Sequence, residues 1–441
     1  MIGFPKSSTE ILNFIKKRQD KNVLSSNGSM VSILKKQMDQ YLLKGLPSHR
    51  QECWRYFPVQ KLIQNEYLFL EEDLKTKEEA QDTFSIPNSF KIFVTNGNIQ
   101  FSNPPKGLHL FLWKDFLKDS SNIDSKIKDQ IYKILKEERN GFCSLNNIFA
   151  LKGFVLWIDQ PIQECIEIRY CQNLTETNKA CNTRAFIFAK KNSSAQIIET
   201  VYGSETKKDL SFFFNIQTDC ILEKNSQLDY IRLDQGTQQT TQVNQLFGTL
   251  GPGAKAHFLT LNLSSGLTRY LTSIHQKEQS SSEIRGLNIL GDANHGNHKV
   301  TVNHDEQSYS NQFYRSFLFD SARHIFNGKI NIEQKAQKTE AYQLNKNLIF
   351  GNKALAISCP ELDVKADDVK ANHGATTSSM EEKSPMLFYL QSRGLGIQES
   401  YHLILLGYLK ETLSAMNKKT FSYFKPLIWN HLKQLQNKNL T

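Results

Sequence analysis

The stretch that decides the fold begins at Tyr230-Ile-Arg-Leu233, because a similar group of four residues returns every 28 positions after it. Turn-forming residues such as Gly251-Pro-Gly253 fill the gaps between the groups. Short apolar alternations at a fixed period are typical of stacked coils, each of which buries its face on the next. The pattern favours a parallel β-helix, and an ordinary β-sandwich is the alternative. The four clear members and two weaker ones are Tyr230-Ile-Arg-Leu233, Phe258-Leu-Thr-Leu261, Gly286-Leu-Asn-Ile289, Tyr314-Arg-Ser-Phe317, Tyr342-Gln-Leu-Asn345 and Lys370-Ala-Asn-His373.

Helical patterns flank this repeat. Residues 1–85 predict helices, with one apolar stripe at Ile11, Phe14 and Ile15 and a second running from Met30 to Leu43. The helical period returns at Met386. It predicts one helix up to Arg393-Gly394 and another over about 398–416, and Pro426 is expected to interrupt the tail.

The region between the helical ends has a period of two, typical of strands. Residues 91–95 and 99–101 predict a hairpin around Asn96-Gly97, and the strand pattern resumes at 153–158 after a helical interlude near 112–135. We therefore expect a mainly β protein in three parts. These are an N-terminal helical domain (1–88), a β-helix core (89–380) and a C-terminal helical domain (381–441).

Composition predicts a soluble protein in the cytoplasm. Hydrophobic residues make up 39% of the 441 positions, so burial can offset chain entropy. The longest apolar stretch, 403–409, is far shorter than the roughly 20 residues that a membrane helix needs, and no secretory signal is visible. The seven cysteines are scattered without a CxxC pair, which favours a reducing compartment.

The net charge of +10 is concentrated at the two ends of the chain. Residues 1–50 contribute +6 and residues 403–441 contribute +5, so the central region is almost neutral. A nucleic-acid enzyme would be expected to place basic residues along a central groove instead. Solvated helix faces explain the basic ends, and an anionic partner is the alternative.

Two short motifs resemble known sites only superficially. The segment Gly248 to Lys255 is rich in glycine, but Ala254 separates the last glycine from the lysine, and Ala256 stands where a phosphate loop has Ser or Thr. We expect a turn there. Asp367-Asp368 could be a catalytic carboxylate pair, yet adjacent residues on a strand point to opposite faces.

Histidines and cysteines offer two weak metal-site candidates. His298 and His304 share one strand face, whereas His295 does not, and the group could be metal ligands or hydrogen-bonded structural residues. Cys165 and Cys171 share a strand face as well, and they could bind a soft metal or be placed there incidentally.

Long motifs follow one another in the segment from Asn303 to Gly394: Phe326-Asn-Gly-Lys-Ile330, Ala336-Gln-Lys-Thr-Glu-Ala341 with Gln343, Pro360-Glu-Leu-Asp-Val364, Ala366-Asp-Asp-Val-Lys370, His373-Gly-Ala-Thr376 and Leu387-Phe-Tyr-Leu-Gln-Ser-Arg-Gly394. In these motifs the segment resembles the SufB/SufD family of iron–sulfur cluster assembly proteins. Weaker similarity extends upstream through Leu145-Asn-Asn-Ile-Phe149 to Glu52-Cys-Trp-Arg-Tyr56. The resemblance implies a right-handed parallel β-helix with helical ends, which the 28-residue period indicates independently.

Within the family the chain looks like the SufD branch. The SufB form carries His-Glu-Ala-Thr where this chain has His373-Gly-Ala-Thr376. The cysteine that is proposed as a cluster ligand in SufB aligns with Leu344 of this chain. Many SufD sequences have a cysteine two residues before the histidine, where this chain has Ala371. His373 is therefore the candidate iron or cluster ligand that the resemblance implies.

The resemblance also implies partners. A SufD-like subunit pairs with a SufB-like paralogue through the β-helix, binds a SufC-like ABC ATPase through its C-terminal helices, and has no ATPase activity of its own. A cluster or iron would be held transiently between the paralogues, with no resident cofactor; flavin binding stays open, and neither nucleic acid nor membrane is expected. Candidate pairing residues are Val364, Asp367, Asp368, Val369, Lys370 and His373, and candidate ATPase-docking residues are Leu387, Tyr389, Arg393, Tyr401, Leu405 and Tyr408.

From the residues alone, two other functional classes of protein remain possible. A β-helix carbohydrate-active enzyme would show clustered outward carboxylates and aromatic residues. An anion- or nucleic-acid-binding module would use the basic ends of the chain.

Overall fold

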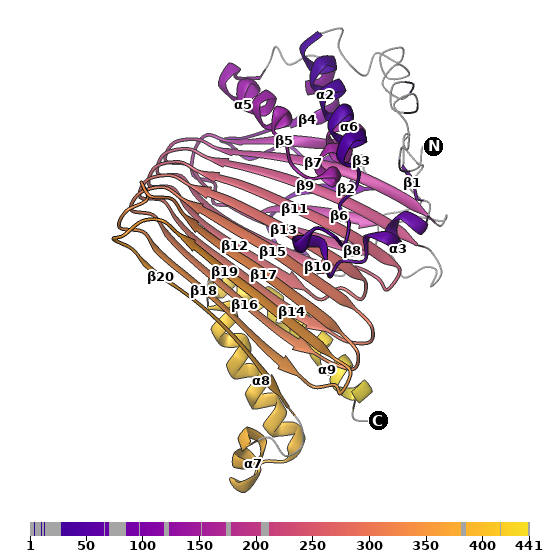
Figure 1. The fold of residues 1–441 in the computed structure, drawn as a ribbon, viewed down its shortest axis with the longest axis vertical. Coiled ribbons are helices and arrows are strands. Elements are labelled where there is room, and N and C mark those ends of the chain that lie inside the picture. Colours follow the sequence, from indigo (N-terminus) through magenta and orange to yellow (C-terminus); the bar gives the residue numbers. More distant parts are fainter. Residues whose placement is uncertain are drawn as a thin grey trace.

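The chain forms a long β-solenoid with helices at both ends (Figure 1). The structure is a computed structural model, and the predicted stripe at Ile11, Phe14 and Ile15 lies outside the residues it describes. Those described residues are 4, 10, 13, 28–65, 67–69, 85–96, 98–118, 123–150, 152–172, 178–203, 211–380, 385–414 and 416–439.

Two parallel sheets form the walls of the solenoid, which makes about seven turns between residues 152 and 379. Successive strands alternate between the sheets, so each coil adds one strand to each wall. The first sheet, sheet A, contains β4 (Leu108–Leu112), β5 (Lys152–Ile158), β7 (Lys179–Ala189), β9 (Phe212–Leu222), β11 (Thr240–Leu250), β13 (Leu267–Gln276), β15 (His295–His304), β17 (Arg323–Ile332) and β19 (Leu355–Val364).

The second sheet, sheet B, begins with a hairpin and then runs in parallel. The hairpin of β2 and β3 confirms the predicted turn, and Asn96 adopts the left-handed conformation there, with φ of 50°. The strands of sheet B are β3 (Asn98–Phe101), β2 (Phe90–Thr95), β6 (Ile166–Gln172), β8 (Ser194–Gly203), β10 (Gln227–Gln235), β12 (Lys255–Asn262), β14 (Ser281–Leu290), β16 (Tyr309–Leu318), β18 (Glu340–Ile349) and β20 (Lys370–Ser379).

The solenoid confirms the repeat, but its coils are not all 28 residues long. Tyr230 pairs with Phe258, 28 positions on, whereas Phe258 pairs with Ile284, which is 26 positions on. Later, Tyr314 pairs with Asn345 and not with Tyr342. Hydrogen bonding between strands fixes the register, and the turns absorb the extra or missing residues. The predicted repeat therefore holds its register from Tyr230 to Phe258 and from Gly286 to Tyr314, and loses it at Gly286, Tyr342 and Lys370.

Helices cover the start of the solenoid and the outer face of sheet A. Helix α2 (Gly28–Lys44) matches the predicted stripe and ends at Gly45, whose φ is 64°. Helices α4 and α5 lie where the helical interlude near 112–135 is expected, and strand β4 ends at its first residue, Leu112. The elements of this cap are α2, a short 3₁₀ helix η1 (Glu52–Trp54), α3 (Val59–Gln64), strand β1 (Leu68–Phe69), α4 (Trp113–Lys118), α5 (Ser125–Lys136) and α6 (Gly141–Phe149).

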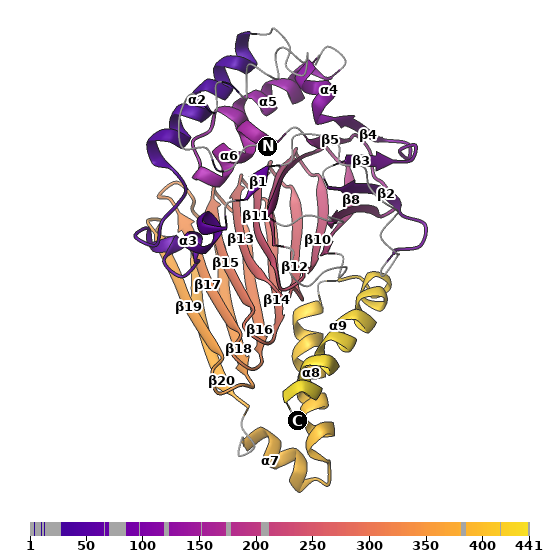
Figure 2. The ribbon, with the colours of Figure 1, turned by 90° about the vertical axis from the view of Figure 1, so that its right-hand side faces the viewer.

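Three helices follow the solenoid: α8 and α9 pack on the outer face of sheet B, and α7 packs against α8 beyond the last coil (Figure 2). They are α7 (Pro385–Ser392), α8 (Ile397–Leu413) and α9 (Lys418–Asn439). The expected interruption at Pro426 is wrong, because α9 continues through it. Pro426 is exposed, so the carbonyl group that loses its partner faces water, while Phe424 and Ile428 on the buried side hold the helix together. No helix in the described ranges is long and apolar enough to cross a membrane.

Candidate functional site at the open end of the solenoid

The solenoid is closed by helices at its start and open at its end. Strands β19 and β20 are the last strands of the two sheets, and no further strand pairs with either among the described residues. Most of β20 is exposed. Pro360 lies in the middle of β19, a position that the sheet tolerates at an edge because proline lacks an N–H group. This end therefore presents unpaired backbone groups that another strand could bind.

His373 lies on β20 at this open end. It pairs in register with Gln343, and Gln343 pairs with Gln312 on the coil before. Ala371, which shares its strand face with His373, packs against interior residues of the last coils. His373 is therefore the outermost member of a column of three polar side chains on the inner face of sheet B. The amide group of buried Gln312 has no hydrogen-bond partner among the described residues.

A second polar row runs through the interior to the same end. Its side chains are joined across the coils: Asn262 donates to Asn288 (3.2 Å), Ser316 to Asn347 (2.6 Å), and Asn347 to Thr377 (3.2 Å) on β20. Such bonds satisfy polar groups that burial would otherwise penalise, so this row stabilises the stacking of the coils. Its members in register are Asp234, Asn262, Asn288, Ser316, Asn347 and Thr377.

Two of the predicted histidine candidates are structural members of this interior. His298 Nε2 lies 2.8 Å from Asn288 Oδ1, and the His304 ring nitrogens lie 2.7 and 2.9 Å from the hydroxyls of Ser308 and Ser310. Burial lowers the pKa of His298 well below its usual value and that of His304 to about 4. Both rings are neutral at cellular pH.

A buried charged group begins the interior polar row. Arg232 forms ion pairs with Glu199 (2.7 Å) and Asp234 (3.2 Å), and Tyr230 and Tyr270 donate to the two carboxylates. Burial raises the pKa of Glu199 and of Asp234, and the charge of Arg232 opposes that rise. This group lies within the wall of the solenoid and is not a site open to solvent.

The cysteine pair does not form a metal site. Cys171 is buried and Cys165 half-buried, while Glu167 and Arg169 between them form a buried ion pair of 2.7 Å. Burial raises the pKa of Cys165 to about 12 and of Cys171 to about 11, so both thiols keep their protons. Among the described residues no group of three His, Cys, Asp or Glu side chains could hold a metal ion.

The predicted pairing residues surround the open end. Asp367 and Asp368 are exposed in the turn between β19 and β20, and Val364 is exposed at the end of β19. Val369 is half-buried and packs against a small core beneath the last coils. Lys370 is exposed and forms an ion pair with Glu340, at 2.9 Å. The turn makes the two aspartates neighbours on the surface.

The predicted docking residues divide into buried and exposed members. Leu387 and Leu405 are fully buried in the core that joins the helices to sheet B, so they position α7 and α8 and cannot contact a partner. Tyr401 donates to the carbonyl of Met380 (3.2 Å). Tyr389 and Arg393 are exposed, with the guanidinium 5.3 Å from the ring centre.

Sequence reasoning missed three exposed apolar residues of this region. Phe388 is 70% exposed, and Met386 and Leu403 are also exposed. A signal was present, because residues 386–390 are five consecutive apolar residues and a helix turns only one side to its core. We call Met386, Phe388 and Tyr389 of α7, together with Leu403 of the neighbouring helix α8, the α7 patch.

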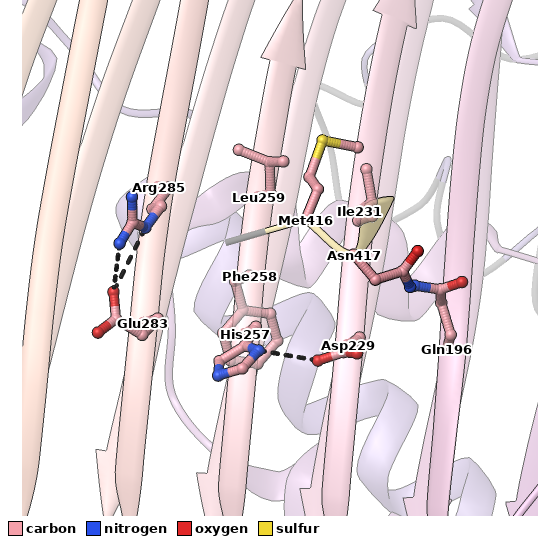
Figure 3. A pocket seen from close by; sticks show the side chains of 10 residues that line it. All are labelled: Gln196, Asp229, Ile231, His257, Phe258, Leu259, Glu283, Arg285, Met416 and Asn417. Atoms are coloured by element: carbon pink, nitrogen blue, oxygen red, sulfur yellow. Dashed lines mark hydrogen bonds and ion pairs between the residues drawn. The ribbon is translucent and has the colours of Figure 1, made fainter. Parts of the chain in front are cut away.

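A small pocket beside the connection between α8 and α9 was also missed. It lies on the outer face of sheet B, next to Met416 and Asn417 (Figure 3). Asp229 and His257 point toward each other there, 2.9 Å apart, and this hydrogen bond raises the pKa of His257. The residues that line the pocket include no serine or cysteine, so the pair has no nucleophile beside it.

The fold and the open end together define a class of protein: a parallel solenoid with helices at both ends, whose exposed features are a sheet edge and an apolar helix. Comparisons of the sequence make this specific. The family model described as the SUF system FeS cluster assembly, SufBD core domain, matches residues 172–408, and the SufBD protein N-terminal region matches residues 6–168. The chain belongs to the SufBD family of iron–sulfur cluster assembly scaffold proteins, which are generally non-catalytic.

Curated relatives agree with the family. An iron–sulfur cluster assembly SufBD family protein of Synechocystis is 24% identical, and the alignment covers 92% of each chain. The iron–sulfur cluster assembly protein SufD of Escherichia coli is 24% identical over 94% of this chain and 95% of its own. SufD of Bacillus subtilis is 25% identical over 64% of each chain. The family assignment favours an assembly protein over a carbohydrate-active enzyme or a nucleic-acid-binding module.

Proposed function

We propose that this chain is the SufD-type, non-ATPase subunit of a scaffold complex that assembles iron–sulfur clusters in the cytoplasm. The observation that carries the proposal is the open end, where two unpaired strand edges surround an exposed histidine. Strand β20 contains no cysteine, and the cysteine of β19, Cys359, lies on the outer strand face with Glu361 and not on the inner face. This chain would therefore bring an imidazole to a site whose thiolates come from elsewhere.

Pairing with a SufB-like paralogue is assigned to the open end. A second solenoid could place its own last strands against β19 and β20 and satisfy their backbone groups. The edge of β20 suits close approach, because its residues after His373 are all small: Gly374, Ala375, Thr376, Thr377, Ser378 and Ser379. Val364, Asp367, Asp368 and Lys370 would form the rim of the contact, while Val369 supports it from beneath.

Docking of a SufC-like ATPase is assigned to the α7 patch. Exposed aromatic side chains are the residues that dominate protein interfaces, and α7 extends past the solenoid where a partner can reach it (Figure 1). Arg393 and the exposed edge of Tyr389 would add polar contacts. Leu387, Leu405, Tyr401 and Tyr408 take the role of holding α7 and α8 in place.

His373 is proposed to handle iron or a nascent cluster, which is cargo of the complex and not a resident cofactor. Neutral imidazole is an established ligand of iron beside thiolates.

Coexpression with a SufB-like and a SufC-like protein tests the whole proposal, with the product measured by light scattering after size exclusion. We expect one complex that contains all three chains. Purification of this chain alone, with the two partners in a separate complex, would contradict the proposal.

A further inference from the structure

Three cations from consecutive coils meet the last turn of α8. Arg285 on β14, Arg315 on β16 and Lys346 on β18, which we call the cationic row, lie on the outer face of sheet B. Arg315 Nη2 is 2.6 Å from Glu411 Oε2, and Lys346 Nζ is 3.3 Å from Glu411 Oε1. Arg285 Nη1 donates to the backbone carbonyl of Glu411 at 3.1 Å.

The contact matches the charge of a helix end. The last carbonyl groups of a helix lack partners inside the helix and carry partial negative charge. Arg315 Nη1 donates to the carbonyl of Tyr408 (2.5 Å), and Arg285 also donates to the Ser414 hydroxyl (3.2 Å). The cationic row therefore binds the Glu411 carboxylate and two backbone carbonyl groups near the end of α8, those of Tyr408 and Glu411. The hydroxyls of Thr412 and Ser414 donate to the same two carbonyl groups.

Arg315 is the central member of the cationic row, and it is only 1% exposed. Its guanidinium lies 4.3 Å from the centre of the Tyr408 ring and 5.2 Å from that of Phe313. Glu411 is the carboxylate paired with this buried charge. Removal of that carboxylate would leave a desolvated cation without its counter-ion, which makes the contact sensitive to a change of a single side chain.

Apolar packing alone would not fix the position of α8. Leu405, Leu409 and their neighbours bury a continuous apolar surface against sheet B, and such contacts are non-directional. Charge-assisted hydrogen bonds have defined geometry. The cationic row thus fixes one end of α8 to three coils, while the other end leads to α7 beyond the solenoid (Figures 1 and 2).

We propose that Glu411 and the cationic row form a latch that transmits displacement of α7 and α8 to the coils of β14, β16 and β18. Strand β18 pairs directly with β20, so the latch links the α7 patch to the open end. This proposal rests on the proposed docking of an ATPase at the α7 patch. Movement of that partner would then shift the strands that surround His373.

Hydrogen–deuterium exchange on the full chain tests whether the latch exists. Glu411→Gln keeps the size of the side chain and removes its charge, and Lys410→Gln is the control because Lys410 is an exposed neighbour on the same helix. We expect Glu411→Gln to speed exchange of the amides of 405–414 about tenfold, and Lys346→Met to have a smaller effect. If the amides of 405–414 exchange at the wild-type rate in Glu411→Gln, the proposal is overturned. If Glu411→Gln misfolds, the same comparison is made with Lys346→Met.

The same measurement on the complex tests transmission. In wild type, adding ATP to the complex with a SufC-like ATPase should change exchange in β20. In Glu411→Gln the ATPase should still co-elute, but the change in β20 should be lost. A response of wild-type size in Glu411→Gln would refute transmission. Failure of wild type to bind the ATPase would instead remove the docking assignment, and the latch proposal would fall with it.

Discussion

His373 and Gln343 share one register position on neighbouring coils, yet only His373 faces solvent. This difference in exposure results from the position of the two strands, because no further coil of the described chain packs on β20 as β20 packs on β18. A polar side chain that would be buried in the middle of the solenoid is available for a ligand at its last strand. The residue that the family resemblance selected is thus exposed by the simple fact that the solenoid ends there.

The first prediction concerns this histidine. His373→Ala should leave complex assembly and ATPase binding intact but reduce cluster formation several-fold, because it removes the imidazole that the proposal assigns to iron. Cluster formation is measured by the visible absorbance and the iron content of the purified complex. Asn372→Ala is the matched control, since Asn372 is exposed on the opposite face of β20. Cluster formation at the wild-type rate would make His373 irrelevant to iron.

The buried histidines predict acid sensitivity. Burial lowers the pKa of His324 to about 3, well below the roughly 6.5 of an unfolded histidine. A lowered pKa means that its contribution to stability is complete above pH 6.5 and is lost as pH falls toward 3. The loss is at most about 1.4 kcal/mol for each pH unit.

Urea denaturation between pH 7 and pH 4 measures that slope. His324→Gln should show a weaker dependence on pH than wild type, because one proton-binding group of the unfolded state is gone. Glu199 and Asp234 have raised pKa values and act in the opposite direction, but they are the same in both proteins. Equal slopes for the two proteins would mean that His324 is not buried as a neutral ring.

At the level of elements, α7 combines one buried and several exposed apolar residues. Phe388→Ser with Tyr389→Ser should weaken ATPase binding at least tenfold without changing the thermal midpoint, because both side chains are exposed. Leu387→Ala should do the reverse and lower stability by about 2–5 kcal/mol, since that leucine is fully buried. Binding is measured by surface plasmon resonance against the SufC-like partner.

The control for this pair is Leu43→Ser, which removes an exposed apolar side chain from α2 at the other end of the molecule. It should leave binding unchanged. ATPase binding that survives the loss of Phe388 and Tyr389 would exclude α7 as the docking element.

The sequence predicted where helices and strands lie better than it predicted which of their side chains are buried. The repeat indicated the solenoid, and the stripe from Met30 to Leu43 indicated α2. Helix α6 was missed because its nine residues are fewer than the 11 or more over which a helical period is recognised. The register drifted because coil length varies at the turns, which leave no mark in the strand pattern. The buried place of Leu387 depends on packing between α7 and sheet B, which no local pattern contains.

At the scale of the whole molecule, the C-terminal helices cover the outer face of sheet B, in addition to any contact that they make with a partner. Deleting residues 386–441 would uncover the apolar outer face of sheet B, including Leu261, Ile289 and Phe317. Such a truncation would lose ATPase binding for a reason unrelated to docking. Point variants of the α7 patch are therefore the informative test.

The last prediction concerns the two unpaired edges at the end of the molecule. Edges of ten residues invite pairing, so the chain without its paralogue should self-associate through β19 and β20, and a SufB-like partner should replace that contact. Val364→Lys with Thr376→Lys places two charges on exposed positions of these strands and should weaken both associations at least tenfold, because charges on an edge oppose strand addition.

Sedimentation velocity measures both associations. Val369 is left unchanged in this test, since it supports the small core beneath the last coils and its replacement would report on folding instead. Ser125→Lys, an exposed change on α5 at the closed end, is the matched control and should behave as wild type. If the variant with lysines at 364 and 376 is folded and still pairs with native affinity, the open end is not where the two solenoids meet, and the assignment of His373 to a shared site fails with it.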